Sequence, residues 1–181
     1  NKNNSSDIFT AKIISKANDK NLKAAIAGYQ KEVGTISKFN HGSLHKVIGF
    51  SPVDFQNENK PVIISEIMLN KTLKDLILLD RKSKSSPLLN DTRKLITIFG
   101  IASAMSYLHS YSIVHHDLKP GNILMNDYLC PQITDVMLTK FFHSDQDKKS
   151  NAIYISPEIW KKSEYTLAGD VYAFGIIVFQ L

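Results

Sequence analysis

The sequence contains almost no cysteine and no long apolar run. Cys130 is the single cysteine in 181 residues, which excludes an internal disulfide and any zinc site built on several cysteines. The longest apolar stretches, residues 61–64 and 173–179, are far shorter than the roughly 20 residues of a membrane-spanning helix. The chain also does not open with the basic and apolar segments of a signal peptide. We therefore expect an intracellular, cytoplasmic protein with no membrane span in this segment.

Arginine is scarce as well, although the chain is basic. Its net charge is +5, which could suggest a nucleic-acid partner. However, only Arg81 and Arg93 carry a guanidinium group, and the lysines are scattered along the chain. Because arginine is the preferred reader of guanine edges and phosphates, we expect a lysine-rich, solvated surface and no nucleic-acid partner.

What remains is the composition of a globular chain, with 43% hydrophobic and 22% charged residues. The apolar pattern predicts strands at residues 8–14, 45–53 and 62–68 and a short hairpin at 123–125 and 132–134. It predicts helices at residues 21–39, 73–79, 92–109 and 167–181. Strands lie mostly at the front of the chain and helices at the back, which indicates an α+β fold.

Residues 92–109 give the strongest helical signal. The face expected to be buried consists of apolar residues at three- and four-residue spacing, namely Leu95, Ile98, Phe99, Ala102, Met105 and Leu108. Asp91 or Thr92 is expected to cap the helix, because a short polar side chain accepts hydrogen bonds from the first turn.

Residues 115–124 carry the most informative chemistry. They read H-H-D-L-K-P-G-N-I-L and place a carboxylate, a cation and an amide at Asp117, Lys119 and Asn122. Asp135 follows thirteen residues after Asn122, across the predicted hairpin, so the two can converge. Amide and carboxylate oxygens suit Mg²⁺, whose other ligands come from phosphate and water. A carboxylate that orients a hydroxyl, beside a lysine that offsets charge, is typical of phosphoryl transfer.

This segment resembles the catalytic loop of protein kinases, H-R-D-L-K-x-x-N in its family form. The rest of the chain then falls into register with that family over essentially all 181 residues. The further matches are Lys12 in A-K-I, Glu32 in the first helix, residues 65–68 at the hinge, 135–137 for D-F-G, 156–158 for A-P-E and 170–175 at the start of the central helix. Residues 155–160 and 170–175 are most similar to the tyrosine-kinase-like group of serine/threonine kinases.

For the reaction itself, the resemblance implies roles for four residues. Asp117 would be the catalytic base or hydroxyl orienter, and Lys119 would offset charge on the transferred group. Asn122 and Asp135 would ligate Mg²⁺. Lys119 and Pro120 after Asp117 are typical of serine/threonine kinases rather than tyrosine kinases. The resemblance therefore implies a protein partner with a serine or threonine acceptor.

For ATP, the resemblance implies that Lys12 grips the α- and β-phosphates and that Glu32 holds Lys12 in place. The other expected ATP-site positions are Ala11 and Leu124 around the adenine ring, Ser65 as gatekeeper, Glu66 and Met68 at the hinge, and Asp75 at the ribose. The internal hydrophobic column that joins the lobes would consist of Ile36, Val47, His115 and Val136.

The implied architecture is a two-lobed protein-kinase-like fold that is incomplete at both ends. Residues 1–68 would form part of a small, antiparallel-sheet lobe, and residues 69–181 part of a mainly helical large lobe ending in the central helix. No glycine precedes Gly28, so the glycine-rich phosphate loop is absent from residues 1–68, and we expect it to lie upstream of Asn1. We expect the isolated 181 residues to be poorly stable and inactive.

The chain departs from the family pattern at three further places. His116 replaces the arginine that commonly receives an activation-loop phosphate, although a protonated His116 could partly substitute. At 135–137, valine under-fills the column at Val136, and Met137 replaces a glycine that tolerates positive φ. Ser150 and Asn151 stand where a glycine and a threonine usually lie.

Two hypotheses of function follow. The first is an ATP- and Mg²⁺-dependent serine/threonine protein kinase, because the residues that would touch phosphate and metal are present. The alternative is a pseudokinase, a nucleotide-binding or scaffolding module with little phosphoryl transfer, which the changes near Val136 and Asn151 favour. The oligomeric state is left open.

Overall fold

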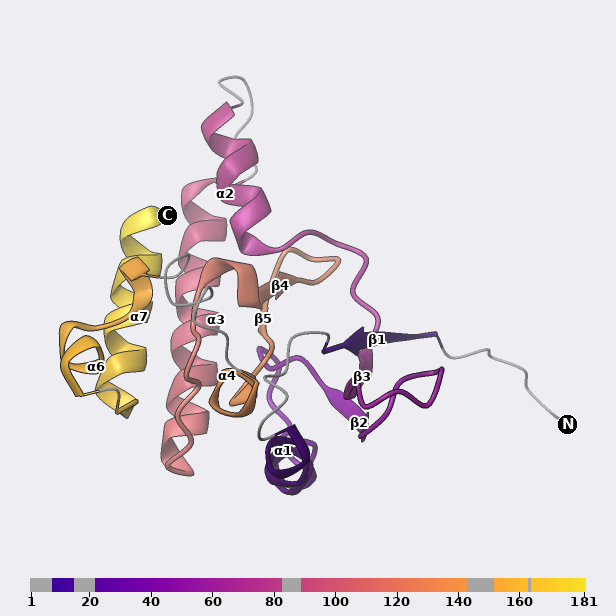
Figure 1. Ribbon diagram of the computed structural model, residues 1–181. Coiled ribbons are helices and arrows are strands. Elements are labelled where there is room, and N and C mark those ends of the chain that lie inside the picture. Colours follow the sequence, from indigo (N-terminus) through magenta and orange to yellow (C-terminus); the bar gives the residue numbers. More distant parts are fainter. Residues whose placement is uncertain (1–7, 15–21, 83–88, 143–151, 163) are drawn as a thin grey trace, which may run out of the picture.

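The computed structural model describes residues 8–14, 22–82, 89–142, 152–162 and 164–181. In its first part, strands β1 (Phe9–Ile13), β2 (Val47–Ser51) and β3 (Val62–Glu66) form an antiparallel sheet in the order β1-β3-β2. Helix α1 (Leu22–Ile36) runs beside this sheet (Figure 1). It packs Tyr29 and Val33 against Ile63 of β3.

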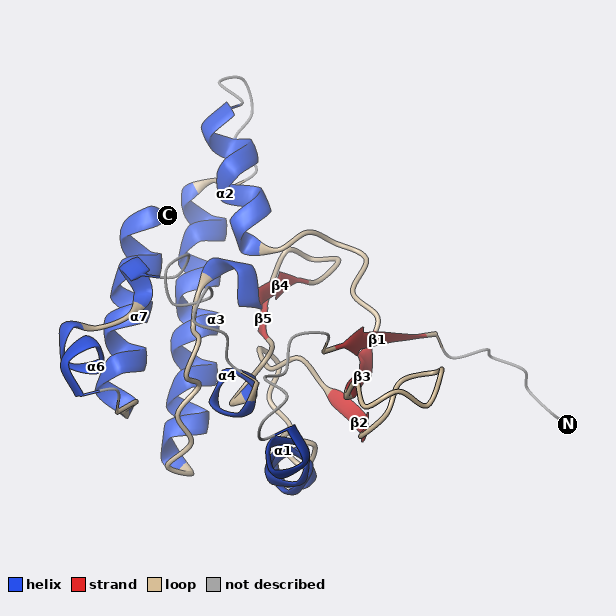
Figure 2. Ribbon diagram, viewed as in Figure 1, coloured by secondary structure: helices blue, strands red, loops and turns tan. Residues whose placement is uncertain are grey.

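Helices dominate the rest of the chain (Figure 2). The longer ones are α2 (Leu73–Lys82), α3 (Asp91–Ser110) and α7 (Leu167–Gln180). Shorter helical segments are η2 (Pro120–Asn122), α4 (Leu138–Phe141), η3 (Ala152–Tyr154) and α6 (Pro157–Lys162). Strands β4 (Ile123–Met125) and β5 (Pro131–Ile133) pair as a small antiparallel hairpin. Separate groups of strands and helices confirm the predicted α+β class.

The main core lies where α3, α7 and the hairpin meet. Ile101 and Leu108 of α3, Ile133 of β5 and Ile177 of α7 are all fully buried in it. No helix among the described residues is long and apolar enough to cross a membrane.

The segment after α1 joins the sheet to the hairpin. The amide of His45 donates to the carbonyl of Ile133 at 2.8 Å, and the Ile133 amide donates to Ser43 at 2.9 Å. On the other side of the hairpin, the Met125 amide donates to the carbonyl of Lys71, just before α2. These backbone bonds hold the hairpin between the sheet and the helices, together with residues 115–122 that lead into it. We call residues 115–122 the catalytic segment, after the loop that they resemble.

The predicted buried face of α3 is partly wrong. Met105 and Leu108 are buried, but Leu95 and Phe99 are 66% and 75% exposed, and Thr97 is fully buried in their place. Apolar residues surround much of this helix, so sequence spacing alone does not select a face; the packing of α7 and β5 does.

The predicted cap of α3 is also wrong. Asn90 is the N-cap, and its Oδ1 accepts from the amide of Arg93 at 2.9 Å.

The predicted helices and strands exist, with ends shifted by a few residues, as is usual where helices fray and strands lose their partners. Ser150 and Asn151 lie outside the described residues. The boundary between two lobes near residue 68 stays a prediction.

Candidate active site

His115 organises the backbone of the catalytic segment. Its fully buried ring accepts from the amide of Asp117 at Nδ1 (3.2 Å), so the proton lies on Nε2, which donates to the carbonyl of Thr134 (3.0 Å). The amide of His115 donates to Asp170 Oδ2 at 2.8 Å, and its carbonyl accepts from Met137. One histidine therefore connects the catalytic segment, the strand end after β5 and the start of α7.

Asp117, Lys119 and Asn122 converge, as the spacing predicted. Lys119 Nζ lies 2.6 Å from Asp117 Oδ2, and Asn122 Nδ2 lies 2.9 Å from the same oxygen. Asn122 Nδ2 also donates to the backbone carbonyl of Asp117 at 2.8 Å. The short helical turn η2, which begins with Pro120, bends the chain back so that residues five apart can meet. A lysine and an amide thus hold the carboxylate in one orientation.

Asp135 lies across the hairpin from Asn122. The backbone carbonyl of Asn122 accepts from the amide of Thr134, the residue before Asp135, at 3.0 Å. Asp135 has φ of 63°, a left-handed conformation that asparagine and aspartate tolerate better than most residues. Both hydrogen bonds of the Asn122 Nδ2 group go to Asp117, so the Asn122 Oδ1 atom points away from Asp117.

These two oxygen donors fit Mg²⁺ by their chemistry. Asn122 and Asp135 offer an amide and a carboxylate oxygen, the ligand types that Mg²⁺ takes. Among the described residues, no group of three or more histidine, cysteine, aspartate or glutamate side chains could enclose a metal ion.

The expected Lys12–Glu32 ion pair is not the one that the structure contains. Lys12 Nζ lies 2.5 Å from Asp135 Oδ2. Glu32 Oε1 instead lies 3.7 Å from Nζ of Lys140 on α4, a residue that the sequence analysis did not single out. The reason is packing: α4 lies against α1, where Phe141 stacks edge-on to Tyr29 and closes over Gly28.

The other expected ATP-site residues lie in β1 and β3, directly after β3, in α2 and on the hairpin. Ala11 pairs with Ile64 in the sheet, Leu124 lies in β4, Ser65 is buried, Met68 is half-buried, and Glu66 is exposed and lies 3.6 Å from Lys46. Asp75 Oδ2 accepts from the hydroxyl and the amide of Thr72, at 2.7 and 3.1 Å. These bonds lower the pKa of Asp75. Thr72 is the N-cap of α2, since its hydroxyl accepts from the Asp75 amide at 3.2 Å, and the Asp75 side chain completes a capping box.

The expected hydrophobic column is partly assembled. Ile36, Val47 and Val136 line one small cavity of about 30 Å³ together with Lys12 and Asp135. The cavity beside Val136 is consistent with the prediction that valine under-fills this position.

Asp170 was missed as a site residue. Its buried Oδ2 accepts from the His115 amide and lies 3.0 Å from His109 Nε2. The sequence showed only a polar residue at the start of an apolar helix. Nothing in the local pattern indicated that it would support a histidine 55 positions away.

A carboxylate held by lysine and asparagine, followed by a second aspartate directly after the hairpin, is the set of side chains typical of phosphoryl-transfer domains. The family described as protein kinase domain matches residues 1–181, and the chain belongs to that family. The chain is 33% identical over 162 residues to "Cysteine-rich receptor-like protein kinase 19" of Arabidopsis thaliana. The matched stretch covers 84% of this chain and 24% of that protein. The chain is 32% identical over 180 residues to "Probable serine/threonine-protein kinase PknB" of Lactococcus lactis subsp. lactis (strain IL1403), covering 97% and 27%. The chain therefore spans about a quarter of the length of these relatives.

Proposed function

We propose that the protein containing this chain transfers the γ-phosphoryl group of ATP to serine or threonine hydroxyls of proteins. The observation that carries the proposal is the cluster at Asp117, whose Oδ2 lies within hydrogen-bond distance of both Lys119 and Asn122. The matching relatives, among them a probable serine/threonine-protein kinase, support the choice of acceptor.

In this proposal Asp117 binds the acceptor hydroxyl and takes its proton on a carboxylate oxygen as the hydroxyl oxygen bonds to the γ-phosphorus. The bond from that phosphorus to the bridging oxygen breaks, and ADP leaves with its electron pair. Lys119 offsets the charge that develops on the transferred group, and its contact with Asp117 keeps it in place. When bound, Mg²⁺-ATP supplies the phosphoryl group and charge neutralisation. Asn122 and Asp135 are the proposed Mg²⁺ ligands.

The remaining proposed positions bind the nucleotide. Lys12 would leave Asp135 to contact the phosphates, and Glu32 would exchange Lys140 for Lys12. The proposed adenine and ribose contacts are Ala11, Ser65, Glu66, Met68, Asp75 and Leu124. An intracellular location is part of the proposal, because a chain with one cysteine fits a reducing compartment.

The test is phosphate transfer from labelled ATP to a generic serine/threonine substrate, measured for the complete protein and for Asp117→Asn. We expect the substitution to lower kcat by roughly 10²–10⁴-fold, the range for loss of a positioned base. Asp91→Asn, at an exposed carboxylate on α3, is the matched control and should retain activity. Equal rates for wild type and Asp117→Asn would overturn the assignment. ATP binding without transfer in either would instead support the pseudokinase alternative, which the comparisons do not favour.

A further inference from the structure

A positively charged pocket lies directly beside the catalytic cluster. It has a volume of about 260 Å³ and is formed by α2, the catalytic segment, η3 and the end of α7. Three of its lining residues are cations, Lys74, Arg81 and Lys119, and its described lining includes no carboxylate. The pocket therefore concentrates positive charge at a point where the protein substrate would have to approach.

The wall opposite α2 is ordered by a hydrogen bond. The hydroxyl of Tyr154 donates to Gln180 Oε1 at 2.9 Å, which ties η3 to the end of α7. Burial raises the pKa of Tyr154, and the nearby charge of Arg81 opposes that rise. Arg81 is exposed and lines the same pocket as Tyr154, so its charge acts on the phenol from within the pocket lining.

The carboxylates of α2 offset these cations only in part. The charge of Asp75 acts on Lys74. Asp75 Oδ2 accepts from the hydroxyl of Thr72, and Asp80 Oδ1 accepts from the amide of Leu89 at 3.4 Å. Neither lines the pocket. The overall charge of +5 acts in the same direction, since it favours the approach of an acidic partner over a basic one.

Lys119 connects the pocket to the chemistry. It lines the pocket and also lies 2.6 Å from Asp117. A polypeptide with its acceptor hydroxyl at Asp117 can therefore place a neighbouring side chain in this pocket.

We propose that this pocket, with Arg81 and Lys74 as its specificity-determining residues, selects protein substrates that carry an acidic side chain close to the acceptor serine or threonine. A carboxylate and a phosphorylated side chain share this anionic chemistry, and the pocket has room for either. The inference rests on the proposed function and names the substrate class of the same site.

The experiment uses the complete protein and a set of serine peptides that differ at one position at a time near the acceptor. Each position carries aspartate, phosphoserine, alanine or arginine, and both kcat/KM and binding by fluorescence anisotropy are measured. We expect aspartate or phosphoserine to raise kcat/KM over alanine at one or two positions, and arginine to lower it. Comparison of the aspartate and phosphoserine peptides shows whether a carboxylate is sufficient or a phosphate is required.

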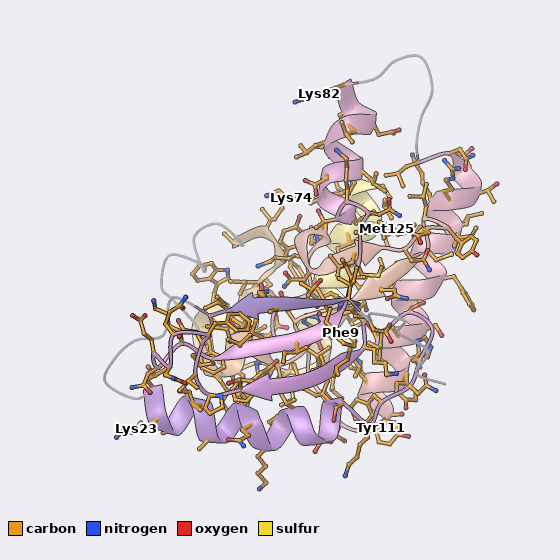
Figure 3. All side chains as sticks on the ribbon, turned by 90° about the vertical axis from the view of Figure 1, so that its right-hand side faces the viewer. Phe9, Lys23, Lys74, Lys82, Tyr111 and Met125 are labelled. Carbon is orange, nitrogen blue, oxygen red and sulfur yellow. The ribbon has the colours of Figure 1, made fainter. Side chains whose placement is uncertain are left out.

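The decisive variants are Arg81→Glu and Lys74→Glu, with Lys23→Glu as the matched control. Figure 3 shows Lys74 on α2 and Lys23 at the start of α1, far from each other. Each pocket variant should reduce the preference for aspartate by up to about fivefold, the upper range for one partly exposed ion pair. The preference should reverse towards arginine in the double variant. Lys23→Glu changes the net charge equally and should leave the preference unchanged.

The two measurements separate this inference from the proposed function. Charge-dependent binding without phosphate transfer would support the pocket and overturn the proposed function. Phosphate transfer with no preference for acidic peptides, or with a preference that survives both pocket variants, would overturn the pocket. An equal loss of preference in Lys23→Glu would also overturn it, because general charge attraction would then explain the effect.

Discussion

Three residues in or beside the candidate active site have backbone conformations that favour glycine. His116, Asp135 and Met137 have φ of 75°, 63° and 60°, each at a cost of about 1 kcal/mol or more. Methionine was expected to resist this conformation at position 137, yet Met137 adopts it with its side chain only 7% exposed. Burial of the methionine and the hydrogen bond from its amide to His115 offset the strain.

The cavity beside Val136 leads to a prediction about stability. Val136→Leu adds one methylene group beside an opening of about 30 Å³. We expect the free energy of unfolding to rise by about 1 kcal/mol, and Tm by roughly 3 °C. Val136→Ala should lower both, as the opposite control. A fall in Tm with leucine, measured by differential scanning calorimetry, would show that the cavity cannot accept the larger side chain.

His116 makes stability depend on pH. Burial lowers its pKa from 6.5 to about 4; the charge of Asp170 opposes this shift, and those of Lys140 and His115 add to it. Its Nδ1 is buried without a hydrogen-bond partner, and its ring stacks on Tyr165. In this structure the histidine is therefore uncharged at neutral pH, and its partial substitution for the phosphate-binding arginine stays a prediction.

The His116 imidazole binds a proton more tightly in the unfolded chain than in the folded chain. The free energy of unfolding should therefore fall as the pH drops from 6.5 towards 4. We expect a loss of about 1–2 kcal/mol between pH 7 and 5 from this residue after solvent screening is allowed for. Urea denaturation at both pH values measures the loss, and His116→Gln should reduce it. Burial also lowers the pKa of His45, so some pH dependence should remain in the variant. An identical loss in wild type and His116→Gln would contradict the assignment.

At the scale of elements, the contact between α1 and α4 decides how the ion pairs are arranged. Tyr29 of α1 stacks edge-on to Phe141 and to Phe142, at ring-centroid distances of 5.8 and 5.3 Å. A Cβ on Gly28 would lie 2.6 Å from the Phe141 ring, so only glycine permits this approach without a shift. The contact brings Lys140 to Glu32 and leaves Lys12 with Asp135.

Lys140→Ala should therefore raise activity rather than lower it. Without its partner on α4, Glu32 can pair with Lys12, and we expect kcat/KM to increase by about threefold, as for one partly exposed ion pair. Lys140→Arg keeps the charge and should change little, and Lys31→Ala removes an exposed lysine from α1 as the matched control. The rate of phosphate transfer measures the effect. A rate unchanged or lowered by Lys140→Ala would contradict the competition between the two pairs.

At the scale of the whole molecule, Asp170 joins the helical core to the catalytic segment. Its side chain is 4% exposed, and Oδ2 interacts with His109 of α3 and with the backbone of His115. Since α7 supplies this carboxylate and α3 one of its partners, their packing and the orientation of the catalytic segment are coupled.

Asp170→Ala should therefore destabilise the folded protein. It leaves a buried amide without an acceptor, and we expect the free energy of unfolding to fall by about 3 kcal/mol. Glu164→Ala, at an exposed carboxylate just before α7, should cost little. Urea denaturation of both variants makes the comparison. Similar values for the two would show that Asp170 does not carry this connection.

The sequence by itself determined the class of fold, the family resemblance and the local chemistry. Asp117, Lys119 and Asn122 are five residues apart or fewer, so one short turn that begins with Pro120 brings them together. Tertiary structure alone decided which partners distant charges take, which face of α3 is buried, and that Lys74, Arg81 and Lys119 share a pocket. Lys12 and Asp135 are 123 positions apart. Their contact depends on how whole elements pack, and apolar spacing along one helix or strand does not encode that placement.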